Sequence, residues 1–280
     1  MASWRDNVDG GQQIDWGRSS ADYGEFRPGP PTSFYSRLRA FDIGCPGQRI
    51  LDLGTGTGVL AREFARGGSV CAGVDLSAGQ IAQAKQLAQA EALEIDFRQA
   101  PAEEIPFEDS TFDLVTANQC WLYFDLERTI AEVRRLLTPG GQLLVSHFTF
   151  MPRVDAVARA SEELVLQYNP QWNGADWNGR IPARPGWSRD HFDLQLMFYY
   201  DEAIEFSHES WRGRLRALRG IGPTLSQERV AEFDLELKRL LAEIAPPRFT
   251  VIHRIDAHVF RFKEEREDAS GLPSGSEVSS

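Results

Sequence analysis

The sequence has no apolar stretch near the ~20 residues that a membrane-spanning helix needs. Its first residues, MASWRDNVDGGQQIDWG, lack the apolar segment of a signal peptide. Cysteine is scarce, since only Cys45, Cys71 and Cys120 occur and no two of them have CxxC spacing. These absences predict a cytoplasmic protein with reduced thiols, no metal site and no membrane partner.

Positive charge is also in short supply. Lys and Arg total 30 against 41 Asp and Glu, which gives a net charge of −11. Proteins that bind nucleic-acid backbones usually carry a basic face. The balance therefore argues against a nucleic-acid partner, although a local basic patch stays open. A length of 280 residues with 42% hydrophobic content suits one large domain, or a core with a lid.

Strand-like and helix-like segments alternate after residue 48. The segments RILDL, VCAGVD, EIDFRQ, FDLVTAN and QLLVSHF favour strands, and most are separated by amphipathic helical stretches. Such alternation predicts βαβ units and a doubly wound, mostly parallel α/β sheet. Later segments predict helices over 153–168, 208–218 and 226–244, and one or two strands each within 192–206 and 249–262.

The pattern divides the chain into parts of different character. We expect a core interrupted by lid segments, with the following boundaries: 1–32 flexible N-terminus and lid segment, 33–150 cofactor-binding core, 151–190 insertion or lid, 191–206 core strand region, 207–246 helical lid, 247–263 final core strand or strands, and 264–280 disordered tail.

Three glycines at alternate positions, Gly54, Gly56 and Gly58, separate the first predicted strand from its helix. Glycine lets the backbone approach a ligand closely, and a helix N-terminus attracts negative groups. Asp75 ends the next strand, 21 residues after Gly54, where a carboxylate can accept both hydroxyls of a ribose. The turn alone also fits a tight strand-to-helix connection without a ligand, but the pair predicts a nucleotide site.

The type of nucleotide follows from what surrounds the turn. Val59 replaces the third glycine of a dinucleotide fingerprint, and no lysine of a phosphate-binding loop follows. Asp52 precedes the first glycine, where its charge would repel a diphosphate and suit a cationic ligand.

Four segments in this order, ILDLGTGTG, AGVDLS, AEEIPFEDSTFDLVTAN and EVRRLLTPGGQLLVS, resemble the class I S-adenosylmethionine-dependent methyltransferases. DYGEFRPGPPTSFY resembles the N-terminal motif of the type 11 group, and SWRGRLRAL with VAEFDLELKRLL resembles the lid helices of its small-molecule members. The resemblance implies a Rossmann-like methyltransferase fold with a seven-stranded sheet, a helical lid and S-adenosyl-L-methionine as cofactor.

The resemblance also assigns roles. It implies cofactor contacts for Tyr23, Arg27, Asp52, Gly54, Thr55, Gly56, Gly58, Asp75, Leu76, Ala102, Glu103 and Asn118. Within this set, Arg27 would pair with the cofactor carboxylate and Asp52 with its ammonium, directly or through water. Pro101 stands where the family often has an aspartate, so Ala102 and Glu103 would contact the adenine through their backbone.

The reaction of an activated methyl group depends mainly on alignment and proximity. His147 follows the fifth predicted strand and is the candidate base, with Gln119 beside the sulfonium as a second catalytic candidate. His208 is an alternative base, and either histidine could be structural. Cys120 is expected to pack, since no proline precedes it as in pyrimidine C5-methyltransferases.

Aromatic residues are the candidates for a substrate pocket. They are Trp121, Tyr123, Phe148 and Trp211, with ordinary lid packing as the alternative. The segment WRGRLRALRG carries four arginines, which suits a solvated helix face or an anionic substrate group.

Together these features predict a methyltransferase that modifies an O, N or C atom of a small aromatic or apolar molecule. Two alternatives remain at this point: an RNA or protein methyltransferase, and a non-catalytic cofactor-binding scaffold. The missing [DNS]-P-P-[YFW] motif and the acidic charge count against the first. The sequence specifies no oligomeric state.

Overall fold

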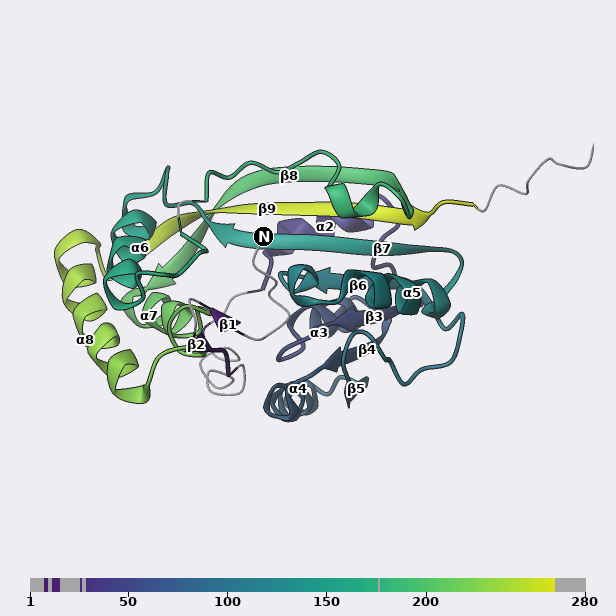
Figure 1. The fold of residues 1–280 in the computed structure, drawn as a ribbon, viewed down its shortest axis with the longest axis horizontal. Helices are drawn as coiled ribbons and strands as arrows, with labels where there is room; N and C mark the ends of the chain where they lie inside the picture. Colours follow the sequence, from purple (N-terminus) through teal and green to yellow (C-terminus); the bar gives the residue numbers. More distant parts are fainter. Residues whose placement is uncertain (1–7, 10–11, 16–25, 27–28, 176, 265–280) are drawn as a thin grey trace, which may run out of the picture.

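The computed structural model describes residues 8–9, 12–15, 26, 29–175 and 177–264. Strands β1 (Val8–Asp9) and β2 (Gln12–Gln13) form a small hairpin. The main sheet has seven strands in the order β5-β4-β3-β6-β7-β9-β8 (Figure 1). Their bounds are β3 Arg49–Leu53, β4 Val70–Asp75, β5 Ile95–Gln99, β6 Phe112–Asn118, β7 Leu137–Phe150, β8 Phe192–Ser207 and β9 Arg248–Phe262.

The sheet is parallel except for one strand. Pairs β3–β4, β4–β5, β3–β6 and β6–β7 are parallel, and β9 runs antiparallel to both β7 and β8. This arrangement confirms the predicted mostly parallel seven-stranded sheet. The strand order reverses at β3, which has β4 on one side and β6 on the other. Ligands of open α/β sheets bind at such switch points, outside the carboxyl ends of the strands.

Helices cover both faces of this sheet, so most residues of its central strands are buried. They are α2 (Thr32–Arg39), α3 (Val59–Arg66), α4 (Ala78–Ala90) and α5 (Leu126–Leu136). Successive residues of β3 face opposite sides: Ile50 packs in one core with Leu60 and Phe64, while Leu51 packs in a second core with Val133. The predicted alternation of strands and helices is therefore present.

A third core lies beyond the carboxyl end of β7 (Figure 1). Helices α6 (Ala156–Tyr168), α7 (His208–Arg216) and α8 (Gln227–Ile244) pack there around Trp211, Phe233 and Leu237. The segments predicted to hold one or two strands each form one long strand, β8 and β9, and the far ends of both strands join this core. The predicted flexible segment 1–32 and tail 264–280 lie largely outside the described residues.

Candidate active site

The turn after β3 depends on glycine for its shape. Gly54 has a φ of +54° and Gly58 a φ of +76°, in the left-handed region that side chains disfavour. A Cβ at Gly54 would lie 2.9 Å from the Cβ of Cys120, and one at Gly58 would lie 2.6 Å from the Phe97 ring. Side chains at either position would therefore close the turn or displace its neighbours.

Asp52 supports this turn from behind. Its carboxylate is 3% exposed and accepts hydrogen bonds from the hydroxyls of Thr55 (2.7 Å) and Thr116 (2.6 Å). Burial raises the pKa of Asp52 to about 6, although the two hydroxyl bonds act in the opposite direction. The two hydroxyl bonds thus hold the carboxyl group directly behind the glycine turn.

Asp75 stands at the end of β4 and faces the cavity. Its Oδ2 accepts the N–H of Gly56 at 2.9 Å and its Oδ1 accepts the N–H of Ser77 at 2.8 Å. Burial raises the pKa of this carboxyl above its ordinary value, and the two backbone bonds partly offset that effect. Each oxygen keeps further lone pairs, so the carboxylate can still accept two hydroxyls.

A cavity of about 920 Å³ opens from this turn toward α6 and α7. Seven of the predicted cofactor residues line it: Gly54, Gly56, Asp75, Leu76, Ala102, Glu103 and Asn118. Three others, Asp52, Thr55 and Gly58, are buried behind the turn. Tyr23 and Arg27 lie outside the described residues. The glycines that face the cavity, Gly54 and Gly56, and the Asp75 acceptors fit the methionine and ribose parts of S-adenosylmethionine.

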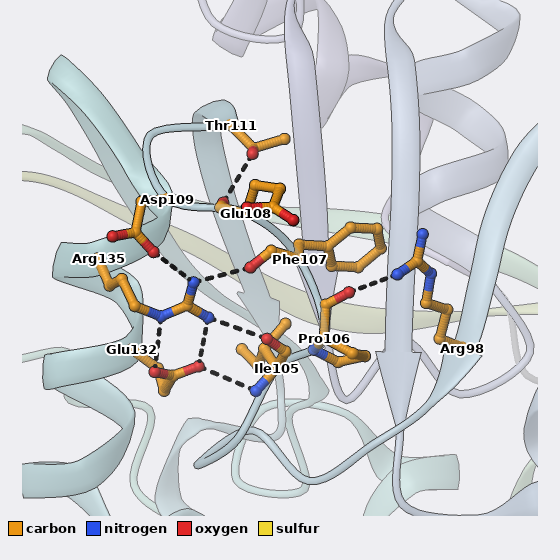
Figure 2. A network of polar contacts seen from close by, with 9 residues as sticks. All are labelled: Arg98, Ile105, Pro106, Phe107, Glu108, Asp109, Thr111, Glu132 and Arg135. Carbon is orange, nitrogen blue, oxygen red and sulfur yellow. Dashed lines mark hydrogen bonds and ion pairs between the residues drawn. The ribbon is translucent and has the colours of Figure 1, made fainter.

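The loop that carries Ala102 and Glu103 is held by α5 and by Arg98 of β5, which donates to the Pro106 carbonyl (Figure 2). Arg135 of α5 donates to the carbonyl oxygens of Ile105 (2.9 Å) and Phe107 (2.7 Å). Glu132 accepts the N–H of Ile105 at 2.9 Å and also binds Arg135. This loop has no regular structure between β5 and the turn before β6, so these contacts fix its position.

His147 and Asp256 form a dyad on neighbouring strands. They are register partners on β7 and β9, and His147 Nδ1 lies 3.1 Å from Asp256 Oδ2. The His147 side chain is 35% exposed and lines the cavity, whereas that of Asp256 is 1% exposed. The carboxylate orients the ring with Nδ1 as donor, which leaves Nε2 as the proton acceptor.

A second histidine shares the same carboxylate. His258 Nδ1 lies 3.5 Å from Asp256 Oδ2, and its Nε2 lies 2.9 Å from the carbonyl oxygen of Pro182. Burial acts to raise the pKa of Asp256, but the hydrogen bonds and charges of His147 and His258 outweigh it and hold that pKa below its ordinary value. The carboxylate therefore stays ionised. Sequence reasoning missed Asp256 and His258; their spacing of two residues on a predicted strand was the available signal.

Gln119 directly follows β6 and has an unusual backbone conformation. Its φ is +61°, which is uncommon for a residue with a side chain. Its N–H donates to the Ser146 carbonyl at 2.9 Å, and its side-chain amide donates to the Phe148 carbonyl and to the Thr149 hydroxyl (3.2 Å). The side chain lines the cavity beside His147, so its strained backbone lies at the site itself.

Cys120 also borders the cavity, but its thiol is held in the protonated form. The thiol lies 3.1 Å from the Leu53 carbonyl. Burial, and then the charges of Asp52 and Asp75, hold the pKa of Cys120 well above its ordinary value. A thiolate is disfavoured here, in agreement with the expectation that this cysteine packs.

The predicted substrate residues separate into two groups. Trp121 and Tyr123 line the cavity. Phe148 instead stacks on His253 at 4.6 Å, and Trp211 is fully buried with its indole N–H donating to Ser161 at 2.9 Å. Both belong to the packed cores, which corrects their predicted position on the wall. Other aromatic residues take that place: Phe124, Phe150, Trp172, Trp177 and Trp187.

The loop after α6 covers the cavity and is tied to β9. Arg254 donates to the Gly179 carbonyl at 2.5 Å and pairs with Asp201 at 2.6 Å, and His258 contacts Pro182. The same loop supplies Trp177 and Pro182 to the cavity wall. The cover is thus fixed by the strand that also supplies Asp256.

Comparison with known proteins agrees with this geometry. A family model described as a methyltransferase domain matches residues 51–145. Demethylmenaquinone methyltransferase from Thermus thermophilus is 41% identical over 123 residues, which make up 42% of this chain and 56% of that protein. A malonyl-acyl-carrier-protein O-methyltransferase from Erwinia billingiae is 30% identical over 184 residues, which cover 64% and 66% of the two chains.

The fold is also similar to that of a solved methyltransferase structure. A structure from Anaeromyxobacter dehalogenans, named as a type II methyltransferase, matches with a TM-score of 0.56 and 22% identity over 84% of this chain and 97% of its own. The matched region spans about half the length of the first curated relatives. The fold and the glycine turn with Asp75 agree with this match, and residues 51–145 of the chain form a methyltransferase domain.

None of the described helices combines the length and the apolar character needed to cross a membrane.

Proposed function

We propose that this protein transfers a methyl group from S-adenosylmethionine to an acidic O–H or N–H, or to an acidic carbon, of a small aromatic molecule, with His147 as the base. The observation that carries the proposal is the His147–Asp256 dyad on the wall of the cavity that also contains the glycine turn. Aromatic residues on the same wall, Trp121, Trp172 and Trp177 among them, suit a planar acceptor.

The proposed division of labour follows from position. S-adenosylmethionine, when bound, supplies a methyl group already activated by its sulfonium. The glycine turn and Asp75 would hold the methionine and ribose parts, and the backbone at Ala102 and Glu103 would face the adenine. Asp52 would favour the positive charge from beneath the turn. Gln119 and Asn118 would border the transferred methyl.

The proton moves to the chain itself. As the acceptor atom forms its bond to the methyl carbon and the carbon–sulfur bond breaks, the acceptor proton passes to His147 Nε2. Asp256 stabilises the resulting imidazolium through its bond to Nδ1. The alternatives kept from the sequence, a macromolecular substrate or a non-catalytic scaffold, are outcomes of the test.

The test uses labelled methyl transfer to a small-molecule extract. We expect wild-type turnover, and a fall of kcat by about a hundred-fold or more in His147→Gln, because a positioned base contributes on that order. His208→Gln is the matched control, since His208 contacts the backbone carbonyls of Ala245 and Pro246 instead of the cavity.

Two results would contradict the proposal. If His147→Gln keeps the wild-type kcat and pH profile, the transfer proceeds by alignment without this base. Label that appears only in protein or RNA, or no label despite binding of S-adenosylhomocysteine measured by calorimetry, would favour the macromolecular or scaffold alternative.

A further inference from the structure

We propose that the methyl acceptor carries an anionic group, a carboxylate or a phosphate, which Arg180, Arg214 and Arg219 bind in the part of the cavity formed by α7 and the loop after α6. This inference rests on the proposed function, because it takes this cavity to hold the acceptor. The three arginines come from two separate segments and line the same cavity.

The arginines of α7 point in different directions. Arg212 and Arg216 both bind Asp234 of α8, at 3.0 and 2.6 Å. Arg214 lies two residues from each, so it projects from the other side of the helix. It is 3% exposed, lines the cavity and has its guanidinium carbon 5.6 Å from the centre of the Phe150 ring. One helix thus uses two arginines for packing and directs the third inward.

Arg219 and Arg180 approach from the two neighbouring segments. Arg219 follows α7, donates to the side chain of Asn173 at 2.6 Å and lies 5.8 Å from the centre of the Tyr123 ring. Arg180 is exposed and follows Gly179, whose carbonyl is held by Arg254. The side chain of Arg219 therefore spans from the loop side of the cavity to the aromatic residues near the end of β6.

The charge balance of this region opposes that of the whole chain. The chain carries a net charge of −11, yet the described residues that line this part of the cavity include three arginines and one acidic residue, Glu162. Guanidinium matches carboxylate and phosphate in a bidentate geometry. Three guanidinium groups on one wall therefore favour an acceptor that carries negative charge. Trp172 and Trp177, beside them, supply flat apolar surface for the rest of the molecule.

The experiment separates a small-molecule extract into anionic, neutral and cationic pools by ion exchange before methylation. Each pool is incubated with the full chain and methyl-labelled cofactor. We expect label transfer with the anionic pool. Arg219→Gln and Arg180→Gln should each raise the apparent KM for that pool by roughly ten- to a hundred-fold, as for a lost hydrogen bond to a charged group, with the Kd for S-adenosylhomocysteine unchanged.

Arg212→Gln is the matched control, because it removes an arginine of α7 that contacts Asp234 and not the cavity. It should leave the acceptor KM at the wild-type value. The acceptor KM of Arg214→Gln is interpreted only if the thermal unfolding of this variant matches that of the wild type, since the side chain is buried. The phosphate and carboxylate sources separate when the anionic pool is treated with phosphatase, which removes acceptor activity only in the first case.

Three outcomes would overturn the inference. Transfer with the neutral or cationic pool alone would leave the methyltransferase proposal intact and reject an anionic acceptor. A raised Kd for S-adenosylhomocysteine in Arg219→Gln and Arg180→Gln, with an unchanged acceptor KM, would assign these arginines to the cofactor carboxylate. No transfer with any pool by the wild type would reject the proposed function together with this inference.

Discussion

At the scale of single residues, the histidines of this molecule lie in different environments. His147 borders the cavity, and His208 contacts backbone carbonyls near its surface. His253 is fully buried between the rings of Phe148 and Phe206, and its Nδ1–H donates to the Val251 carbonyl at 3.0 Å. Its environment admits only the neutral form.

That burial makes a prediction about acid stability. Burial, partly offset by the Val251 bond and reinforced by the charge of Arg214, lowers the pKa of His253 to about 3. Below the ordinary histidine pKa of about 6.5 the unfolded chain takes up a proton that the folded chain refuses, so stability falls as the pH falls. Going from pH 7 to pH 5 should cost about 2 kcal/mol through this residue.

Urea unfolding of the wild type and of His253→Phe at both pH values checks this prediction. Phenylalanine keeps the stacked packing and does not titrate. The difference in unfolding free energy between the two proteins should shift by about 2 kcal/mol in favour of the variant at pH 5. A difference that stays constant with pH would show that His253 is protonated within the fold.

At the scale of elements, α5 acts on the cofactor side of the cavity without touching it. Arg135 and Glu132 hold the loop at Ile105 and Phe107 (Figure 2). Arg98, from β5, stacks on Phe107 with its guanidinium carbon 4.0 Å from the ring centre. The loop has no regular structure, so these contacts from α5 and β5 set its position on the cavity wall.

We therefore expect Arg135→Met to weaken the binding of S-adenosylhomocysteine by roughly three- to ten-fold, because two loop carbonyls lose a charged donor. Arg134→Met is the control on the next residue of α5, since Arg134 stacks on Phe262 and not on the loop. Isothermal titration calorimetry measures both. Equal Kd values for Arg135→Met and the wild type would mean that the loop holds its shape unaided.

Local sequence signals were enough to predict the elements near the glycine turn. The residues that were misplaced or missed are positioned by contacts between distant parts of the chain. The glycines and Asp75 stand directly at strand ends, so their position at the carboxyl edge of the sheet could be predicted in order along the chain. Asp256 meets His147 only through the pairing of β9 with β7, across 109 residues. Trp211 was expected at the substrate because it begins a lid helix, but its direction depends on how α6 and α7 pack.

At the scale of the whole molecule, the packed cores fall into two parts. One part is the two faces of the sheet, and the other is the core of helices α6, α7 and α8, called the lid below. Two cores lie on the faces of the sheet, and the third joins α6, α7 and α8 to the ends of β8 and β9. The cofactor end of the cavity borders the sheet, whereas Trp172, Arg214 and Leu218 come from the lid side. Substitutions that destabilise the sheet cores and substitutions that destabilise the lid core should therefore differ in their effects on cofactor binding and methyl transfer.

Phe233→Ala tests this division, because Phe233 is fully buried in the lid core. Such a truncation costs about 3–5 kcal/mol. We expect faster hydrogen exchange in α6, α7 and α8, a larger loss of methyl transfer than of S-adenosylhomocysteine binding, and retained protection in β3 and β4. Phe64→Ala, in a sheet core, should weaken binding and turnover together. Parallel losses in both variants would show one cooperative unit.

The position of β9 has a consequence for the order in which function is acquired. The glycine turn and Asp75 belong to segments made early in synthesis, whereas Asp256 arrives on a strand that must enter between two strands already made. A nascent chain that has passed β7 but not β9 holds the glycine turn, Asp75 and His147 but lacks Asp256 and the strand that joins β8 to the sheet. The pairing of this one strand therefore completes the seven-stranded sheet and brings Asp256 to His147 together.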